Sequence, residues 1–270
     1  MRYGLNQAGF PTDEFAETCP ILAAAGYDGV EPNVERDGPL TTDDGRREAA
    51  EVVAAHGLTV PAISTISHWE YPLSSDDDEL REIGLEIGRD MIDAAAALDA
   101  EDVLIVPAVI EDGASYDADY ERAVDSVRRL TDYAADRDVG VAIENVQNNF
   151  LPSPDEFAAF LDDVEDAGPV GAYFDVANAL RSGLPSRWLH ALEGRIAKIH
   201  VKDWHTDAHR VTYPPQGDIN WARVLDAFDA IGYDDWITAE VPAYPSFPER
   251  MPPDILDTMR FLFEDGGDRR

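Results

Sequence analysis

The chain is poor in cysteine and in positive charge. Its 270 residues include one cysteine, Cys19, so neither an intrachain disulfide nor a cluster of thiolate metal ligands is expected. The 21 Lys plus Arg are outnumbered by 55 Asp plus Glu, which gives a formal net charge of −34. Because a nucleic-acid surface needs a basic track, this composition argues against a nucleic-acid partner.

Long apolar runs are also missing. No stretch approaches the roughly 18 uninterrupted apolar residues of a membrane span. The N-terminal sequence MRYGLNQAGF has no apolar segment typical of a secretory signal. We therefore expect a cytoplasmic protein with no membrane partner.

Lysine is nearly absent, since Lys198 and Lys202 are the two lysines of the chain. An acidic composition with arginine in place of lysine resembles that of proteins from salt-loving microbes. Dense carboxylates keep such a protein hydrated, and salt screens their mutual repulsion. Most of the acidic residues are therefore expected on the solvated surface and not in a site.

Eight short apolar runs alternate along the chain with eight amphipathic segments. Because eight successive β-then-α units close a barrel of parallel strands, the pattern predicts a single (β/α)8 TIM barrel domain over residues 1–270. The expected strands are 2–7, 28–33, 59–65, 102–108, 140–146, 171–177, 196–202 and 235–241. The expected helices lie near 13–25, 42–56, 76–98, 116–137, 153–166, 186–193, 220–231 and 251–264.

Four residues with side chains that can bind a metal stand at or near the C-terminal ends of consecutive expected strands: Glu144, Asp175, His200 and Glu240. Strand ends of one parallel barrel converge on a single mouth, so these side chains are expected to meet. Three carboxylates and one imidazole suit a divalent metal, with Mn²⁺ first and Mg²⁺, Co²⁺ or Zn²⁺ as alternatives. The sequence therefore predicts one metal site at this mouth.

Other polar residues are expected near the same mouth as substrate contacts. Asn6 and Glu31, which end the first two strands, are expected to contact either the substrate or the metal ligands, and His68 follows the third strand beside Trp69. A histidine in a surface loop is the alternative interpretation for His68.

Two lysines share a strand face with His200, because side chains alternate along a strand. Lys202, near the rim, is a candidate substrate contact, whereas the deeper Lys198 is expected to neutralise buried carboxylates. Asn178 follows Asp175 by three residues. Arg210 lies in the long connection 203–219, which is a candidate lid.

Five motifs occur in a characteristic order: AIEN at 142–145, FDVAN at 174–178, KIHVKD at 198–203, GDINW at 217–221 and GYDDWITAEV at 232–241. Together they resemble the xylose isomerase-like TIM barrels, which include sugar phosphate isomerase/epimerases, ketose 3-epimerases and inosose dehydratases. The resemblance covers the whole chain. It implies that Glu144, Asp175, His200 and Glu240 bind one divalent metal, and that Glu144 and Glu240 flank the substrate as an acid/base pair.

The resemblance further implies a metal-dependent isomerase or epimerase of carbohydrate metabolism, which acts on a ketose or ketose phosphate through an enediolate intermediate. We expect the protein to bind a small-molecule sugar or sugar phosphate. Its oligomeric state stays open, with a homodimer or a homotetramer as the alternatives to a monomer. Asn178 departs from the family pattern, since many members have histidine there.

Three alternatives remain. KIHVKD is closer to the inosose dehydratase and uncharacterised isomerase branches of the family, so a dehydratase on the same scaffold is the first alternative. An abasic-site endonuclease would need more His and Asp ligands and a basic groove, which this acidic chain with 6 His lacks. A barrel that binds a sugar without catalysis would have no need of the complete quartet of ligands.

Overall fold

The computed structural model describes residues 1–12 and 14–264. Its main sheet has eight strands in the order β2-β1-β10-β7-β6-β5-β4-β3, and each neighbouring pair is parallel. Two further parallel backbone pairs, Gly29 with Thr59 and Asn33 with Ser64, connect the two ends of the sheet. The predicted TIM barrel is therefore confirmed. The strands are β1 (Arg2–Asn6), β2 (Gly29–Glu31), β3 (Ala62–Ile63), β4 (Asp102–Ile105), β5 (Gly140–Glu144), β6 (Val170–Asp175), β7 (Ile196–Val201) and β10 (Trp236–Ala239).

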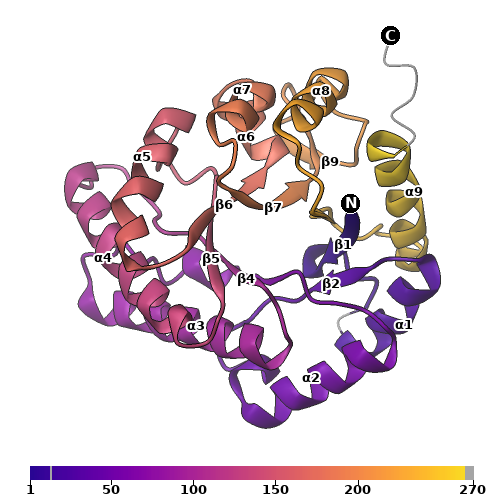
Figure 1. Ribbon diagram of the computed structural model, residues 1–270, viewed down its shortest axis with the longest axis horizontal. Helices are drawn as coiled ribbons and strands as arrows, with labels where there is room; N and C mark the ends of the chain where they lie inside the picture. The colour runs from indigo at the N-terminus through magenta and orange to yellow at the C-terminus, as the bar shows by residue number, and fades with distance from the viewer. Residues whose placement is uncertain (13, 265–270) are drawn as a thin grey trace.

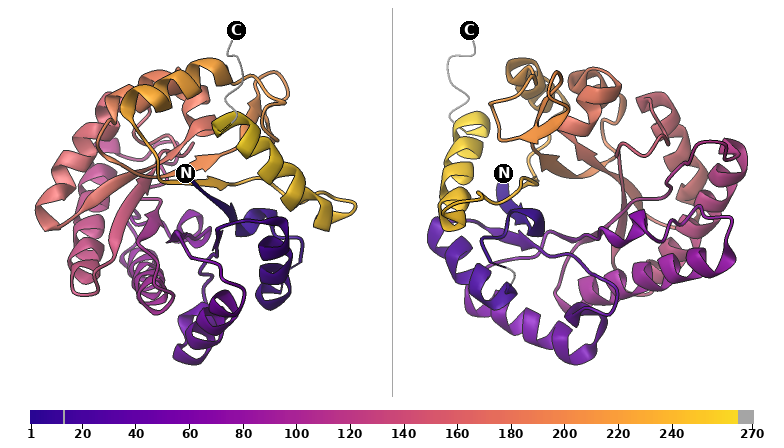
Figure 2. Two further views of the ribbon diagram at one scale, coloured as in Figure 1. Left: turned by 45° about the vertical axis from the view of Figure 1, so that its right-hand side comes forward. Right: turned by 180° about the vertical axis from the view of Figure 1, so that it is seen from behind.

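The helices form a ring around the strands (Figures 1 and 2). Helix starts are capped where the sequence provides a polar side chain, as at Ser153 and Asn220, whose side chains accept hydrogen bonds from the backbone N–H groups three residues on. The helices are α1 (Phe15–Ala25), α2 (Asp43–Ala55), α3 (Asp78–Ala97), α4 (Tyr116–Ala135), α5 (Pro154–Val164), α6 (Val176–Ser182), α7 (Pro185–Ala191), α8 (Trp221–Ile231) and α9 (Met251–Phe263). Short 3₁₀ turns occur at Gln7–Gly9, Pro39–Thr41, Ser67–Trp69, Glu165–Ala167 and Pro248–Arg250.

The structure differs from the expected elements in three places. The strand expected at 59–65 is reduced to β3, because Pro61 has no N–H to donate to a neighbouring strand. Helix α6 starts directly after β6 and was not predicted. The connection 203–219 contains an antiparallel hairpin of β8 (Asp203–His205) and β9 (Arg210–Thr212), which was not predicted either.

Alternation along the strands separates two sets of side chains. One set, which includes Ile143 and Phe174, packs in the main core with the apolar faces of the helices. The other set forms a small second cluster from Ala62, Leu104, Val106, Ala142 and Tyr173. Ala142 and Tyr173 precede Glu144 and Asp175 by two residues, so they share a strand face with them. The barrel interior is thus apolar below its polar mouth.

Close packing also fixes the opposite end of the barrel. A Cβ on Gly29 would lie 2.7 Å from the ring of Trp236, so this position requires glycine. The ammonium of Lys198 lies 2.8 Å from Glu101, 2.7 Å from Asp102 and 3.6 Å from Asp235. Lys198 therefore neutralises carboxylates, as predicted.

Across the residues that the structure describes, no helix combines the length and apolarity that crossing a membrane would take.

Candidate metal centre

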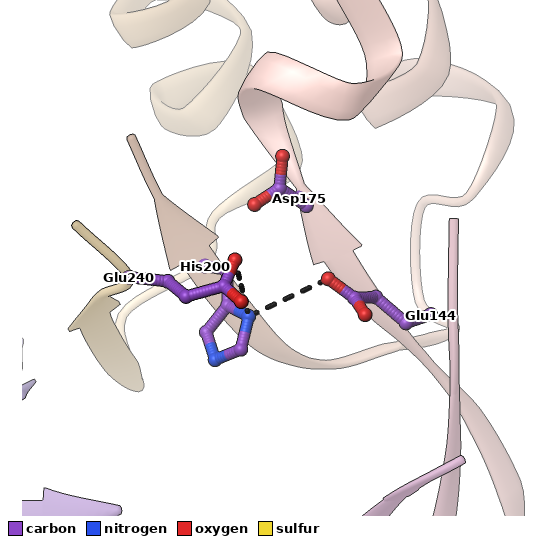
Figure 3. Close-up of side chains that lie close together, drawn as sticks. All are labelled: Glu144, Asp175, His200 and Glu240. Atoms are coloured by element: carbon purple, nitrogen blue, oxygen red, sulfur yellow. Dashed lines mark ion pairs between the residues drawn. The ribbon is translucent and has the colours of Figure 1, made fainter. Parts of the chain in front are cut away.

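Four neighbouring strands bring the predicted ligands together. The sheet order β10-β7-β6-β5 places Glu240, His200, Asp175 and Glu144 in succession around the barrel. Asp175 is directly opposite His200 in the β6–β7 register, and the N–H of Glu240 donates to the carbonyl of Val201. One ligand atom from each residue lies within 4.8 Å of those from the other three. In Figure 3, dashed lines connect the carboxylates of Glu144 and Glu240 to the same ring nitrogen of His200.

Burial differs among the four residues, and burial and neighbouring charges together shift their pKa values. Asp175 and His200 are 0% and 1% exposed and Glu144 is 7% exposed, whereas the Glu240 side chain is 27% exposed. Burial raises the pKa of Glu144 to about 7, and the charge of Glu240 adds to the effect. Burial also raises the pKa of Asp175. Burial opposes ionisation of Glu240 too, but the charges of Lys202 and His200 outweigh it and lower the pKa of this carboxyl.

His200 is oriented by a carboxylate beneath it. Its Nε2 lies 2.8 Å from Glu31 Oε1, and because a carboxylate only accepts, Nε2 carries a hydrogen. Nδ1 then faces Glu144 Oε1 at 3.5 Å and Glu240 Oε2 at 3.6 Å. Although burial alone lowers the pKa of His200, Glu31 and Glu240 raise it well above its usual value. A cation at this site therefore competes with a proton on Nδ1.

Two of the candidate ligand atoms are buried without a hydrogen-bond partner: Asp175 Oδ2 and His200 Nδ1. Buried polar atoms in proteins nearly always have a hydrogen-bond partner, so these two atoms are available to coordinate a cation. Oxygen and imidazole nitrogen donors are those that Mn²⁺, Mg²⁺, Co²⁺ and Zn²⁺ accept. The cluster could therefore hold a divalent metal.

Lys202, predicted to contact substrate, extends into the same cluster. Its Nζ lies 3.1 Å from Asp175 Oδ2, too poorly aligned for a hydrogen bond, and it donates a short hydrogen bond to Glu240 Oε2. Burial disfavours the ammonium, but the carboxylates of Asp175 and Glu240 raise the pKa of Lys202 above its usual value. Lys202 thus offsets part of the negative charge of the centre.

Glu31 and Asn6 are buried behind His200 and are not exposed at the mouth of the barrel. Glu31 is 0% exposed and accepts hydrogen bonds from Asn6, His200 and Tyr173. Asn6 also donates to Ser64 Oγ at 3.0 Å. The Tyr173 ring lies 4.4 Å from the His200 ring. Sequence reasoning missed Tyr173, although its position two residues before Asp175 places it on the same face of β6.

Two asparagines support the carboxylates. Asn178 donates its N–H to Asp175 Oδ1 at 2.6 Å, and its Nδ2 lies 3.5 Å from Glu144 Oε1. Asn145 exchanges two hydrogen bonds with the backbone of Asp175, at 2.9 and 2.7 Å. Asn145 was not singled out from the sequence, although it closes the AIEN motif directly after Glu144.

The structure does not bring His68 and Arg210 to this centre. His68 is 0% exposed beneath α3, where its Nε2 lies 3.2 Å from the carbonyl oxygen of Gly84. The buried position differs from both interpretations of the sequence, because the chain folds back under α3 after β3. Arg210 is exposed on β9, opposite His205 in the hairpin.

Asp203 anchors that hairpin to α8. Its carboxylate accepts from the backbone N–H groups of Trp204 and Ile219 and from Trp221 Nε1. A Cβ on Gly217 would lie 2.2 Å from Asp203 Oδ1, which explains the glycine of the GDINW motif. The connection 203–219 is thus tied to the barrel beside Lys202.

Comparisons with known proteins show similarity in sequence and in fold to sugar epimerases. The chain is similar to the L-ribulose-5-phosphate 3-epimerase UlaE of Salmonella typhimurium, with 27% identity over 85% of this chain and 83% of that protein. Its fold is similar to that of an L-ribulose 3-epimerase, with a TM-score of 0.84, 20% identity and coverage of 97% and 94% of the two chains. The D-allulose 3-epimerase of Methylomonas sp., solved in complex with D-allulose, gives a TM-score of 0.81, 18% identity and 97% coverage of both chains.

These relatives are sugar epimerases, which belong to the isomerase class that the sequence predicts. The family model described as xylose isomerase-like TIM barrel matches residues 19–264. The chain belongs to the xylose isomerase-like TIM barrel family.

Proposed function

We propose that the protein is a divalent-metal-dependent epimerase that inverts the carbon next to the carbonyl of a ketose or ketose phosphate. The observation that carries this proposal is the cluster of Glu144, Asp175, His200 and Glu240, whose ligand atoms lie within 4.8 Å of one another. The three relatives named above are sugar 3-epimerases by name, and these names support the same activity.

The four clustered residues would hold the metal, with Mn²⁺ as the first candidate. When bound, a divalent ion supplies Lewis-acid polarisation of the substrate carbonyl and stabilises developing negative charge. Glu31 and Tyr173 hold the His200 ring in position, and Asn145 holds the backbone of Asp175. The chain thus fixes the ligands from behind and leaves Glu240, the most exposed of the four, at the open side.

Glu144 and Glu240 transfer the protons. One removes the proton from the carbon beside the carbonyl, which leaves an enediolate, and the other returns a proton to the opposite face. The Lys202 ammonium donates a hydrogen bond to Glu240, which favours the carboxylate form that a base requires. Return to the opposite face inverts the carbon, whereas removal of a proton from C1 and its return to C2 would give aldose–ketose isomerisation.

Dehydration is the second candidate. Lys202 comes from the KIHVKD motif, which resembles the inosose dehydratases, and its ammonium reaches Glu240 in the cluster. Loss of a β-hydroxyl from the same enediolate would release water in place of an epimer.

Turnover in D₂O tests these alternatives. The Mn²⁺-loaded protein would be incubated with ketoses, ketose phosphates and inososes, and the products would be analysed by NMR and mass spectrometry. An epimer that carries solvent deuterium on the carbon next to the carbonyl supports the proposal. An epimer without solvent deuterium would contradict proton transfer by the two glutamates. A dehydrated product would show that the protein is a dehydratase.

A further inference from the structure

The ammonium of Lys202 lies between two of the candidate metal ligands. Lys202 follows β7, and the two ligands come from the neighbouring strands, Asp175 at the end of β6 and Glu240 directly after β10. Lys202 Nζ lies 3.1 Å from Asp175 Oδ2 and donates a hydrogen bond to Glu240 Oε2. Because the lysine side chain is only 10% exposed, its ammonium is held inside the centre. A cation that belongs to the chain itself thus contacts two carboxylates that could bind a metal.

The carboxylate oxygens that face Lys202 are also the ones that suit a metal. Asp175 Oδ1 accepts the N–H of Asn178, whereas Oδ2 has no hydrogen-bond partner among the described residues. Glu240 Oε2 lies 3.6 Å from His200 Nδ1, which is likewise without a hydrogen-bond partner in the described part of the chain. A metal at this centre and the ammonium of Lys202 therefore compete for the same two oxygens.

The outcome of this competition depends on the charge of the incoming ion. A monovalent ion such as K⁺ has the charge of an ammonium, so it gains no Coulomb energy by replacing Lys202, and the hydrogen bond to Glu240 is lost. A divalent ion has twice the attraction to each carboxylate at the same distance, which offsets that loss. An ammonium at this position therefore favours divalent over monovalent ions.

The backbone at Lys202 is fixed, whereas its side chain can rotate. The next residue, Asp203, accepts hydrogen bonds from the backbone of Trp204 and Ile219 and from the indole of Trp221. Lysine carries its charge on a flexible four-carbon stem, so rotation of the side chain moves the ammonium without a change in the backbone. Exchange between the ammonium and a metal thus requires no rearrangement of the barrel.

We propose that Lys202 is a charge filter of the metal centre. Its ammonium excludes monovalent cations from Asp175 and Glu240 and yields these oxygens to a divalent ion, whose charge then keeps both groups in the carboxylate form. This inference rests on the metal centre of the proposed function. If Lys202 instead positioned the carboxylates for the metal, its removal would weaken metal binding, whereas removal of a competitor strengthens it.

The Mn²⁺ affinity of Lys202→Met in two salts tests the filter. The EPR signal of free Mn²⁺ would measure binding in molar KCl and in molar tetramethylammonium chloride, whose bulky cation cannot enter the buried centre. Both salts screen the surface carboxylates to the same extent. In tetramethylammonium chloride, Lys202→Met should bind Mn²⁺ about 10- to 100-fold more tightly than the wild type, because a repulsive contact between charges is removed. In KCl this gain should shrink, because K⁺ can take the place of the ammonium.

Three further variants control the result. Lys198→Met removes the same charge from the other end of β7, where Lys198 pairs with Glu101 and Asp102, and should change the Mn²⁺ affinity less than about threefold. Lys202→Arg keeps the charge and should bind Mn²⁺ no more tightly than the wild type. His200→Ala removes a candidate ligand and shows which part of the binding belongs to this centre.

Chemical labelling of the wild type gives a measurement that needs no variant. Lys198 and Lys202 are the two lysines of the chain, so mass spectrometry after treatment with a small acylating reagent follows each separately. Saturating Mn²⁺ should speed the labelling of Lys202, because its amine leaves the two carboxylates, and should not affect Lys198. Labelling of Lys202 at the same rate with and without Mn²⁺ would overturn the exchange.

The possible outcomes separate this inference from the proposed function. Weaker or unchanged Mn²⁺ binding by Lys202→Met in tetramethylammonium chloride overturns the filter, even if the Mn²⁺-loaded wild type epimerises ketoses. An equal gain in both salts overturns the exclusion of monovalent ions. A gain that KCl reduces supports the filter, even if the wild type converts no sugar and the proposed epimerase is thereby overturned. If neither protein binds Mn²⁺, the filter and the metal centre are overturned together.

Discussion

Glu31 on β2 holds His200 on β7 by a buried hydrogen bond of 2.8 Å, although 169 residues separate them in the chain. The carboxylate fixes the hydrogen on Nε2 and leaves Nδ1 directed at Glu144 and Glu240. Carboxylates that hold a metal-binding histidine in this way set its tautomer and raise its basicity. Glu31 thus belongs to the metal centre through His200.

Glu31→Gln is expected to lower Mn²⁺ affinity about 10- to 100-fold, the usual effect of removing such a partner. The neutral amide holds the His200 ring less firmly and no longer favours a positive charge nearby. Competition with a fluorescent chelator measures the affinity. Glu35→Gln, an exposed change four residues away, is the control. Equal affinity in the two variants would show that Glu31 does not tune the site.

Removing a ligand directly should have a larger effect. His200→Ala and Glu144→Gln are expected to lose most of the bound metal and the activity, because each removes one of four clustered donors. Metal analysis of the dialysed proteins checks this, with His190→Ala, a change of an exposed residue on α7, as the control. Full occupancy in both variants would remove these residues from the site.

Glu240→Gln should separate catalysis from binding. Because Glu240 is the proposed base and the most exposed of the four, its loss should lower kcat by about 100-fold or more while the sugar still binds. Steady-state kinetics and calorimetry at saturating Mn²⁺ measure the two effects. A loss confined to KM would contradict a role in proton transfer.

Salt should stabilise the protein. The net charge of −34 produces self-repulsion that added ions screen. We expect the unfolding midpoint to rise from low salt to molar KCl, and sucrose at equal osmolality controls for solvent exclusion. An unchanged or lower midpoint in KCl would contradict the interpretation that the composition is an adaptation to salt.

His68 should make stability depend on pH. Burial lowers the pKa of its imidazole from 6.5 to about 4, and the hydrogen bond to Gly84 opposes this only partly. Between these values the unfolded chain binds a proton that the folded chain does not, so the free energy of unfolding falls as the pH falls from about 6.5 to about 4. The full loss is about 3 kcal/mol.

A comparison of variants separates the pH dependence that His68 causes from the pH dependence that the many carboxylates cause. The difference in unfolding free energy between wild type and His68→Gln, measured by denaturant titration in molar KCl, should change by that amount across the interval. His190→Gln, which removes a surface histidine, should show no such change. A constant difference between wild type and His68→Gln at all pH values would contradict the burial of a neutral imidazole.

The sequence by itself determined the barrel and the meeting of four side chains. Period-two alternation is local, so it assigns Glu144 and Asp175 to the same face as their interior neighbours Ala142 and Tyr173. Eight successive β-then-α units then dictate that strand ends converge. These two rules together predict from the sequence that the four side chains cluster.

Only the tertiary structure decided which side chain meets which. Alternation gives the face of a residue but not its partner across the barrel, and that partner depends on closure and register. The closed barrel thus brings Glu31 to His200 and Lys202 to Glu240. His68 is buried under α3 because packing of the connection after β3, and not its local sequence, fixes the depth of that side chain.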